Sequence, residues 1–217
     1  KVLEISPDDY CQQAVESSRS VRLPNSKSES ENLAMISQVY EAYETLKRQE
    51  RTLDFEDVLL LTVGMLEEDR GVRERVRDQY RYFTVDEYQD VSPLQQRLLN
   101  LWLGNREEIC VVGDAAQTIY SFAGATSNFL LNFKNRFPNA QTFRLSTGYR
   151  STPEIINTAN LILRTANLIS DHGIELQSAN NHGEKPVVNG FASAADEISY
   201  VAAEVLGQIN SGVNSSD

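Results

Sequence analysis

The sequence predicts an α/β fold in which a mainly parallel sheet is flanked by helices. Short runs of β-branched and aromatic residues, typical of strands, alternate with longer segments in which apolar residues recur at the spacing of amphipathic helices. Strands that alternate with helices in this way pair in parallel. The predicted strands are 82–85, 109–112, 141–145 and 187–191.

A helical segment, residues 1–50, is expected to precede the sheet. Ser6 and Ser28 each have an acid three positions further on, the spacing at which a capping side chain and an acidic partner close the first turn of a helix. After Ser28, apolar residues recur at helical spacing to the end of this segment. The apolar stripe includes Tyr40 and Tyr43, for which packing in a helical bundle is the preferred interpretation.

The remaining helices are predicted from caps and apolar stripes. Asp54 caps a helix whose stripe should be buried against the sheet, and Ser92 opens another with a proline and a capping-box glutamine. Arg73 and Arg77 share a helix face, which could contact a phosphate backbone or, as preferred here, be an ordinary solvated surface. The predicted helices are 54–66, 70–81, 92–103, 127–137, 151–170 and 198–209.

Composition restricts the possible functions. The 217 residues are 41% hydrophobic, enough for one good core or two small ones. The net charge of −11 argues against a surface that coats DNA in general, because such affinity comes from Lys and Arg, so any DNA contact must be local. Cys11 and Cys110 fit neither a disulfide framework nor a metal-binding pattern, which favours a reducing cytoplasm. No signal peptide or membrane span is recognisable.

Acidic side chains follow two of the predicted strands. Asp86 and Glu87 come directly after 82–85, and Gly113-Asp114 comes directly after 109–112. A single acidic pair is most simply an acidic turn, but ligands bind at the carboxyl ends of parallel strands, where one carboxylate can hold Mg²⁺ and its neighbour can orient a water. Two strands that end in this way therefore predict a site.

Four segments of the chain together resemble successive motifs of the UvrD/Rep/PcrA-like superfamily 1 DNA helicases. Their order and spacing match those of the family. The segments are 54–60 (Asp-Phe-Glu-Asp-Val-Leu-Leu), 86–90 (Asp-Glu-Tyr-Gln-Asp), 111–125 (Val-Val-Gly-Asp-x-x-Gln-Thr-Ile-Tyr-x-Phe-x-Gly-Ala) and 149–152 (Tyr-Arg-Ser-Thr). The resemblance implies a RecA-like P-loop NTPase motor that uses ATP and Mg²⁺ and moves on single-stranded DNA in the 3′ to 5′ direction.

The resemblance also implies roles for residues that handle ATP. Asp86 matches the Mg²⁺ ligand, Glu87 the residue that orients the attacking water, and Gln117 the sensor of the terminal phosphate. Arg150 matches an arginine that reaches that phosphate from the second motor domain, where its planar fork can bind two phosphoryl oxygens. Tyr149 matches the aromatic residue that stacks on adenine.

Contacts with DNA are implied for Tyr120 and Phe122, which match aromatic residues that stack on bases of single-stranded DNA. A buried anchor is the alternative interpretation of Phe122. Residues 1–50 resemble the end of a helical subdomain that lies over DNA, 51–145 the later part of the first motor domain, and 146–217 the start of the second.

The sequence departs from the family pattern in several places. Ala115 and Ala116 stand where a second acid is usual, and Ala123 stands where an arginine is usual. No Gly-x-x-x-x-Gly-Lys-Ser/Thr phosphate loop occurs in the 217 residues. We therefore expect an internal fragment of a helicase that binds single-stranded DNA and single-strand/duplex junctions, depends on the remainder of the same chain, and hydrolyses no ATP alone. The alternatives are part of a helicase-nuclease and a degenerate, non-catalytic scaffold that binds DNA or protein.

Overall fold

The computed structural model describes residues 3–16, 28–166 and 174–214. The chain divides into two compact units, the first reaching Arg144 and the second starting at Leu145. Over the ranges described, no helix is both long enough and apolar enough to cross a membrane.

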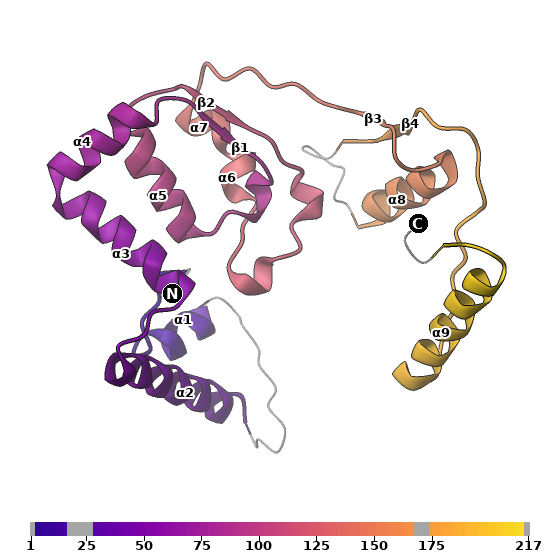
Figure 1. Ribbon diagram of the computed structural model, residues 1–217, viewed down its shortest axis with the longest axis horizontal. Helices are drawn as coiled ribbons and strands as arrows, with labels where there is room; N and C mark the ends of the chain where they lie inside the picture. The colour runs from indigo at the N-terminus through magenta and orange to yellow at the C-terminus, as the bar shows by residue number, and fades with distance from the viewer. Residues whose placement is uncertain (1–2, 17–27, 167–173, 215–217) are drawn as a thin grey trace. The chain divides into compact units, whose positions relative to one another are not determined.

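The first unit begins with two packed helices, α1 (Tyr10–Glu16) and α2 (Glu29–Glu50) (Figure 1). The Ser28 hydroxyl accepts a hydrogen bond from the third residue of its helix, which confirms the predicted cap. The Ser6 hydroxyl accepts one from the Asp9 amide, but the helix itself begins only at Tyr10. The Tyr40 hydroxyl donates to the carbonyl of Ile5, so this tyrosine fastens the two segments together.

A lysine cluster joins α2 to the next helix, α3 (Phe55–Glu68). Asp54 and Asp57 form the capping box at the start of α3. The Nζ atom of Lys47 lies 2.9 Å from Asp54 Oδ2 and 2.6 Å from Asp57 Oδ2, and Lys47 is only 8% exposed. The two acids of the Asp-Phe-x-Asp segment therefore both cap a helix and bind a largely buried lysine.

The core of the first unit lies among α3, α4 (Arg70–Gln79) and α5 (Pro93–Leu103) (Figure 1). Ser92 and Gln95 form the predicted capping box at the start of α5. The buried cluster, in which α3 meets α5, consists of Val63, Leu66, Leu94 and Leu98.

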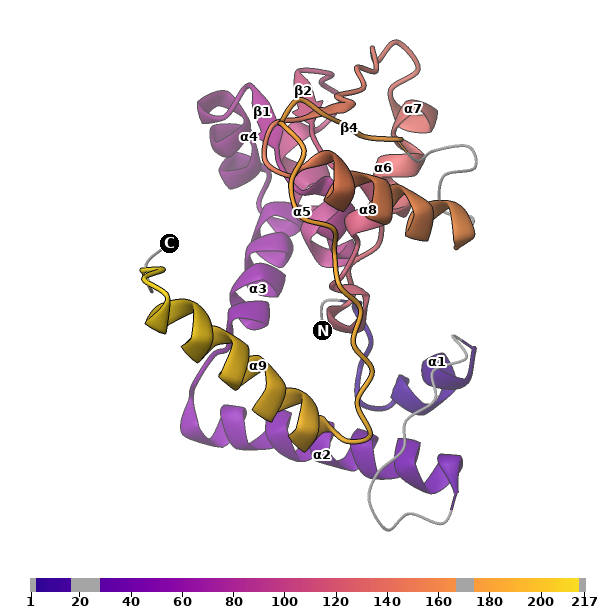
Figure 2. The same ribbon diagram turned by 90° about the vertical axis from the view of Figure 1, so that its right-hand side faces the viewer.

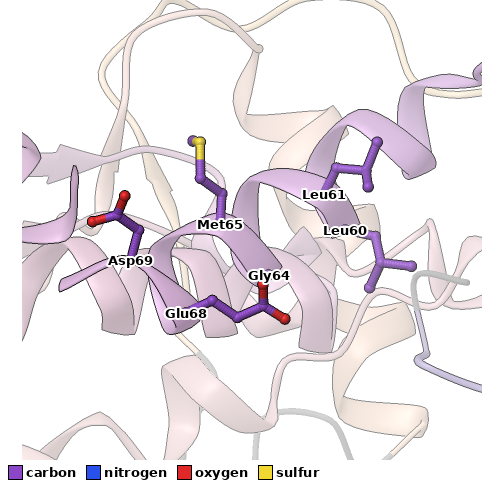
Figure 3. Close-up of a pocket in the computed structure, with 6 residues that line it drawn as sticks. All are labelled: Leu60, Leu61, Gly64, Met65, Glu68 and Asp69. Atoms are coloured by element: carbon purple, nitrogen blue, oxygen red, sulfur yellow. The ribbon is translucent and has the colours of Figure 1, made fainter. Parts of the chain in front are cut away.

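The prediction that the apolar stripe of α3 is buried against the sheet is wrong. The face of α3 that carries Val63 and Leu66 packs on helix α5, whereas Phe55 is 88% exposed. A pocket on the exposed side of α3 is shown in Figure 3, and it contains none of the predicted site residues. The residues that line it are Leu60, Leu61, Gly64, Met65, Glu68 and Asp69.

Arginines of α4 and of the loop after α5 satisfy carbonyl groups at helix ends. The Arg73 guanidinium donates to the carbonyls of Leu66 and Glu67, at the end of α3. Arg77 donates to a carbonyl near the end of α5, and Arg106 donates to carbonyls at the ends of both α4 and α5. The preferred interpretation of Arg73 and Arg77 as an ordinary solvated face is therefore wrong, because carbonyls left without partners at helix ends attract these cations.

Two short strands, β1 (Phe83–Val85) and β2 (Ile109–Val111), pair in parallel, which confirms the predicted orientation. Phe83 stacks on Trp102 of α5, with 6.2 Å between ring centroids. Successive side chains point to opposite faces of a sheet, and Thr84 of the same strand is exposed. Among the described residues, one face of this strand is therefore covered and the other is exposed.

The predicted helix 127–137 is divided into α6 (Asn128–Leu131) and α7 (Phe133–Arg136). Between them, the Asn132 side chain donates to the carbonyl of Asn128 while its own backbone leaves helical geometry. Asparagine often competes with a helix in this way. Residues 141–145 form no strand.

In the second unit, two short strands, β3 (Thr147–Gly148) and β4 (Gln177–Ser178), pair in parallel. The helices of this unit are α8 (Pro153–Thr165) and α9 (Ala194–Asn210). Helix α8 lies against β4 (Figure 2). The predicted strand 187–191 is irregular, and Val188 is 91% exposed. The part of the predicted helix 151–170 beyond residue 166 falls outside the described residues.

Candidate active site

The carboxyl ends of β1 and β2 meet at one edge of the sheet. Val85 pairs with Val111 in the parallel register. Beyond this pair, the Val112 amide donates to the carbonyl of Val85 at 2.8 Å, and the Tyr88 amide donates to the carbonyl of Val112 at 2.9 Å. The two segments that carry the predicted acids are therefore held together by backbone hydrogen bonds.

Asp86 and Glu87 form the turn that leaves β1, and both are exposed. The Glu87 amide donates to Asp86 Oδ1 at 2.9 Å. Glu87 has φ 50° and ψ 41°, a left-handed conformation that costs roughly 1–2 kcal/mol for a residue with a side chain. Strain of this kind tends to cluster at functional sites, although Glu4 and Arg51, which belong to no predicted site, also have positive φ.

Gln89 connects the two strand ends and is only 1% exposed. Its Oε1 atom accepts a hydrogen bond from the Asp114 amide at 3.0 Å, and its Nε2 atom donates to Glu87 Oε2 at 2.6 Å. Because a backbone amide can only donate, Oε1 must face Asp114, which leaves Nε2 to face the carboxylate. The orientation of the Gln89 amide group is thus determined by its neighbours.

Gly113 makes this connection possible. A Cβ atom at Gly113 would lie 2.6 Å from Gln89 Oε1 and 3.1 Å from Leu130 Cδ2. The missing side chain therefore leaves room for the Gln89 side chain.

The hydrogen bonds continue from Asp114 to Gln117. Asp114 Oδ1 accepts from the Ala116 amide, and Oδ2 accepts from Gln117 Nε2, each at 3.0 Å. Glu87 and Gln117, two of the predicted site residues, therefore belong to one chain of hydrogen bonds that runs through Gln89 and Asp114. We call these four side chains the glutamine-linked network.

Tyr120 and Phe122 follow this network along the chain, around a short 3₁₀ helix (Ser121–Ala123). Their ring centroids lie 6.1 Å apart. Tyr120 is 51% exposed and Phe122 is 82% exposed, so the Phe122 ring is not a buried anchor among the described residues. Their contact with DNA stays a prediction.

Tyr149 and Arg150 belong to the second unit, in the turn between β3 and α8, and both are exposed. The Asn180 side chain donates to the carbonyl of Tyr149 at 3.0 Å and to that of Ser151 at 3.3 Å. The Ser178 hydroxyl also donates to the carbonyl of Ser151, at 2.7 Å. The loop after β4 therefore braces the turn through backbone carbonyls.

A second attachment holds the same loop to the start of α8. Glu154 accepts a hydrogen bond from the Gly183 amide at 2.9 Å, and its other oxygen lies 2.6 Å from His182 Nδ1. These two contacts, the amide first, lower the pKa of Glu154 to about 2. His182 thus belongs to this loop and contacts a carboxylate.

The chemistry of Asp86 fits a magnesium ion that is held jointly by protein and nucleotide. Throughout 3–16, 28–166 and 174–214, no group of three or more His, Cys, Asp or Glu side chains could hold a metal ion. Mg²⁺, however, commonly takes only one or two protein carboxylates, with waters and substrate phosphates completing its shell. An exposed carboxylate at a strand end meets that requirement.

Sequence reasoning missed Gln89 and the loop that carries Asn180. Gln89 lies inside one of the matching motifs, but its burial depends on packing against residues that are distant in the sequence. Asn180 lies in a polar connection without an evident pattern.

Parallel strands with acids at their carboxyl ends, where Gln89 joins the Glu87 carboxylate to the Asp114 backbone, define an α/β protein with polar groups gathered at the edge where such sheets bind ligands. Comparison with known proteins is more specific. The family model described as the UvrD/REP helicase N-terminal domain matches residues 5–138, and the chain belongs to this family, which implies a RecA-like helicase fold. The small parallel sheets and many helices do not by themselves establish that fold in detail.

Curated relatives extend the comparison beyond residue 138. The chain is 44% identical over 188 residues to "ATP-dependent DNA helicase UvrD2" of Mycobacterium tuberculosis (strain ATCC 25618 / H37Rv), a match that covers 85% of this chain and 27% of that protein. It is 33% identical over 178 residues to "ATP-dependent DNA helicase PcrA" of Staphylococcus epidermidis (strain ATCC 12228 / FDA PCI 1200), covering 82% of this chain and 24% of the relative. The chain thus spans about a quarter of the length of these relatives.

Proposed function

We propose that this chain is part of an ATP-dependent DNA helicase that moves 3′ to 5′ on single-stranded DNA and unwinds duplexes at single-strand/duplex junctions. The observation that carries the proposal is the glutamine-linked network, which places Glu87 and Gln117 in one set of hydrogen bonds beside Asp86. The family membership and the printed names of the relatives support it. The rest of the helicase chain would supply the phosphate loop and most of the second motor domain.

Each predicted residue has a chemical task in this proposal. Asp86 would hold Mg²⁺, which neutralises charge on the phosphates when it is bound. Glu87 would orient the attacking water and accept its proton, while Gln117 would donate to the terminal phosphate. Arg150 would stabilise charge that develops on the transferred phosphoryl group, and Tyr149 would stack on the adenine.

ATP hydrolysis by the helicase that contains this chain tests the proposal. With Mg²⁺, phosphate release should increase when single-stranded DNA is added. Glu87→Gln should lower the turnover by about 100-fold or more, because it removes the proton acceptor, and should leave nucleotide binding unchanged. Glu107→Gln, which changes an exposed acid before β2, is the matched control. Absence of DNA-stimulated hydrolysis in the wild-type helicase would reject the proposal.

The DNA contact is tested separately with Phe122→Ala. Base stacking on an aromatic ring contributes about 1–3 kcal/mol per base, so the affinity for single-stranded DNA should fall accordingly at a fixed salt concentration. Tyr82→Ala, which removes another highly exposed ring, is the control. Equal affinity of the wild type and Phe122→Ala would exclude stacking by this residue.

A further inference from the structure

We infer that Gln89 is a positioning residue that holds the Glu87 carboxylate in place and couples it to the segment leading toward Tyr120 and Phe122. The inference rests on the proposed function, because it assigns Glu87 to the orientation of water. The supporting observations are the burial of Gln89, its hydrogen bonds to Glu87 and Asp114, and the close approach of Gly113.

The first step concerns the freedom of the Glu87 side chain. A glutamate on an exposed turn has several rotamers of similar energy, and catalysis by a carboxylate requires one of them to be held. A bond of 2.6 Å from Gln89 Nε2 to Glu87 Oε2 selects one arrangement. Within the described residues, no hydrogen bond reaches Glu87 Oε1, so this oxygen remains available to a water molecule.

The second step concerns the rigidity of the donor. The Gln89 amide group is buried, and its oxygen is bound to the backbone of Asp114. Rotation of this amide would bring its nitrogen toward another donor and its oxygen toward a carboxylate, leaving buried polar groups unpaired at a cost of about 1–3 kcal/mol. The donor that faces Glu87 is therefore held by the segment after β2 as well as by its own segment.

The third step extends the connection toward the exposed aromatic residues. The carboxylate of Asp114 accepts a hydrogen bond from Gln117, which lies three residues before Tyr120 in the sequence. A displacement of 114–117 would move the amide that holds Gln89 and thereby the donor that holds Glu87. This arrangement provides a physical route by which DNA at Tyr120 and Phe122 could alter the rate of ATP hydrolysis.

Two different substitutions break the same connection. Gln89→Leu removes the hydrogen bonds to Glu87 and Asp114, together with a longer one of 3.4 Å to Asp90 Oδ2, with little change in side-chain size. Gly113→Ala leaves Gln89 intact, but places a Cβ atom 2.6 Å from its Oε1 atom and so displaces the amide. Gly64→Ala is the matched control, because a Cβ atom at Gly64 would meet nothing within 4 Å.

The test is steady-state ATP hydrolysis by the helicase that contains this chain, with and without single-stranded DNA. Gln89→Leu and Gly113→Ala should each lower the DNA-stimulated kcat by about 10- to 100-fold, the effect usual for residues that orient a catalytic group. The KM for ATP should not change, and Gly64→Ala should behave as the wild type. A role limited to packing would lower the thermal midpoint without lowering kcat per folded molecule.

The outcomes separate this inference from the proposed function. A wild-type helicase without DNA-stimulated hydrolysis rejects the proposed function and the inference with it. An active wild type whose kcat is unaffected in the variants rejects the inference alone. If Gln89→Leu does not fold, Gly113→Ala and the shorter Gln89→Asn decide the question, since each moves the amide away from Glu87 while retaining a polar side chain at position 89.

Discussion

The strand ends of the first unit and the Tyr149–Arg150 turn of the second are stabilised in opposite ways. Around Glu87, the bonds pass between side chains and through a buried amide, that of Gln89. Around Arg150, the bonds end on backbone carbonyls, while Tyr149 itself is 77% exposed. The first arrangement holds a particular functional group, whereas the second holds the path of the chain and leaves its side chains exposed.

Among the variants that test this difference between the two units, Arg150→Ala should have the largest effect, and that effect should be on turnover. A guanidinium that meets a phosphoryl group in the transition state contributes about 10³-fold or more to turnover, so kcat in the helicase should fall by that order. Thermal stability should be unchanged, because the side chain is exposed. Arg150→Lys should restore little, since an ammonium group lacks the planar fork. A large fall in the thermal midpoint would show that Arg150 has a structural role.

A smaller effect, on stability alone, is expected for Tyr88→Phe in the first unit. The buried Tyr88 hydroxyl donates to Gln96 Oε1 at 2.6 Å. Its removal leaves a buried acceptor without that donor, which should lower the free energy of unfolding of the 217-residue chain by about 1–3 kcal/mol. Tyr82→Phe, at an exposed ring, is the control. Equal denaturation midpoints for the two variants would show that the hydrogen bond between Tyr88 and Gln96 does not stabilise this region.

The Asn180 hydrogen bonds of the second unit should stabilise the protein less than the buried Tyr88 hydroxyl of the first unit does. Asn180→Ala removes two hydrogen bonds to carbonyls at an exposed position, and we expect a loss of about 0.5–1.5 kcal/mol in chemical denaturation. The neighbouring Asn181→Ala, which removes an exposed amide of the same kind, should have no effect. If both variants unfold at the same denaturant concentration, the loop does not brace the turn.

The smallest effect concerns pH. The pKa of Glu154 is lowered from its ordinary value of 4.5 to about 2, so its contacts contribute stability above pH 4.5 that is lost as the pH falls toward 2. The wild type should therefore exceed Glu154→Gln in denaturation midpoint at pH 6, and the difference should shrink through that range. A difference independent of pH would exclude the charge as its cause, and Glu184→Gln is a matched control.

Features that depend on adjacent residues could be predicted from the sequence. The caps at Ser28, Asp54 and Ser92 were predicted because a hydroxyl or carboxylate reaches an amide three positions further on, whatever the tertiary structure. The parallel orientation of the strands followed from the alternation of strand and helix patterns, whereas which strands pair with each other was not predicted.

Features that depend on distant partners could not be predicted. Residues 141–145 and 187–191 have strand-like composition, but a strand also needs a neighbour, and β3 pairs instead with the polar pair Gln177–Ser178. The role of Gln89 likewise depends on the position of Asp114, in the segment that follows another strand. Whether a side chain is buried between two segments depends on how those segments pack, and the order of residues in the sequence does not show this packing.

The left-handed backbone at Glu87 has a consequence for how this position would change under selection. Glycine and asparagine adopt that conformation with less strain than glutamate, but neither retains a carboxylate at the distance that Gln89 requires. Either replacement would relieve about 1–2 kcal/mol of strain while taking the shortest acceptor from the buried Gln89 Nε2 atom, at a cost of about 1–3 kcal/mol. Selection for heat resistance should therefore gain little from either replacement, and selection for turnover should remove both.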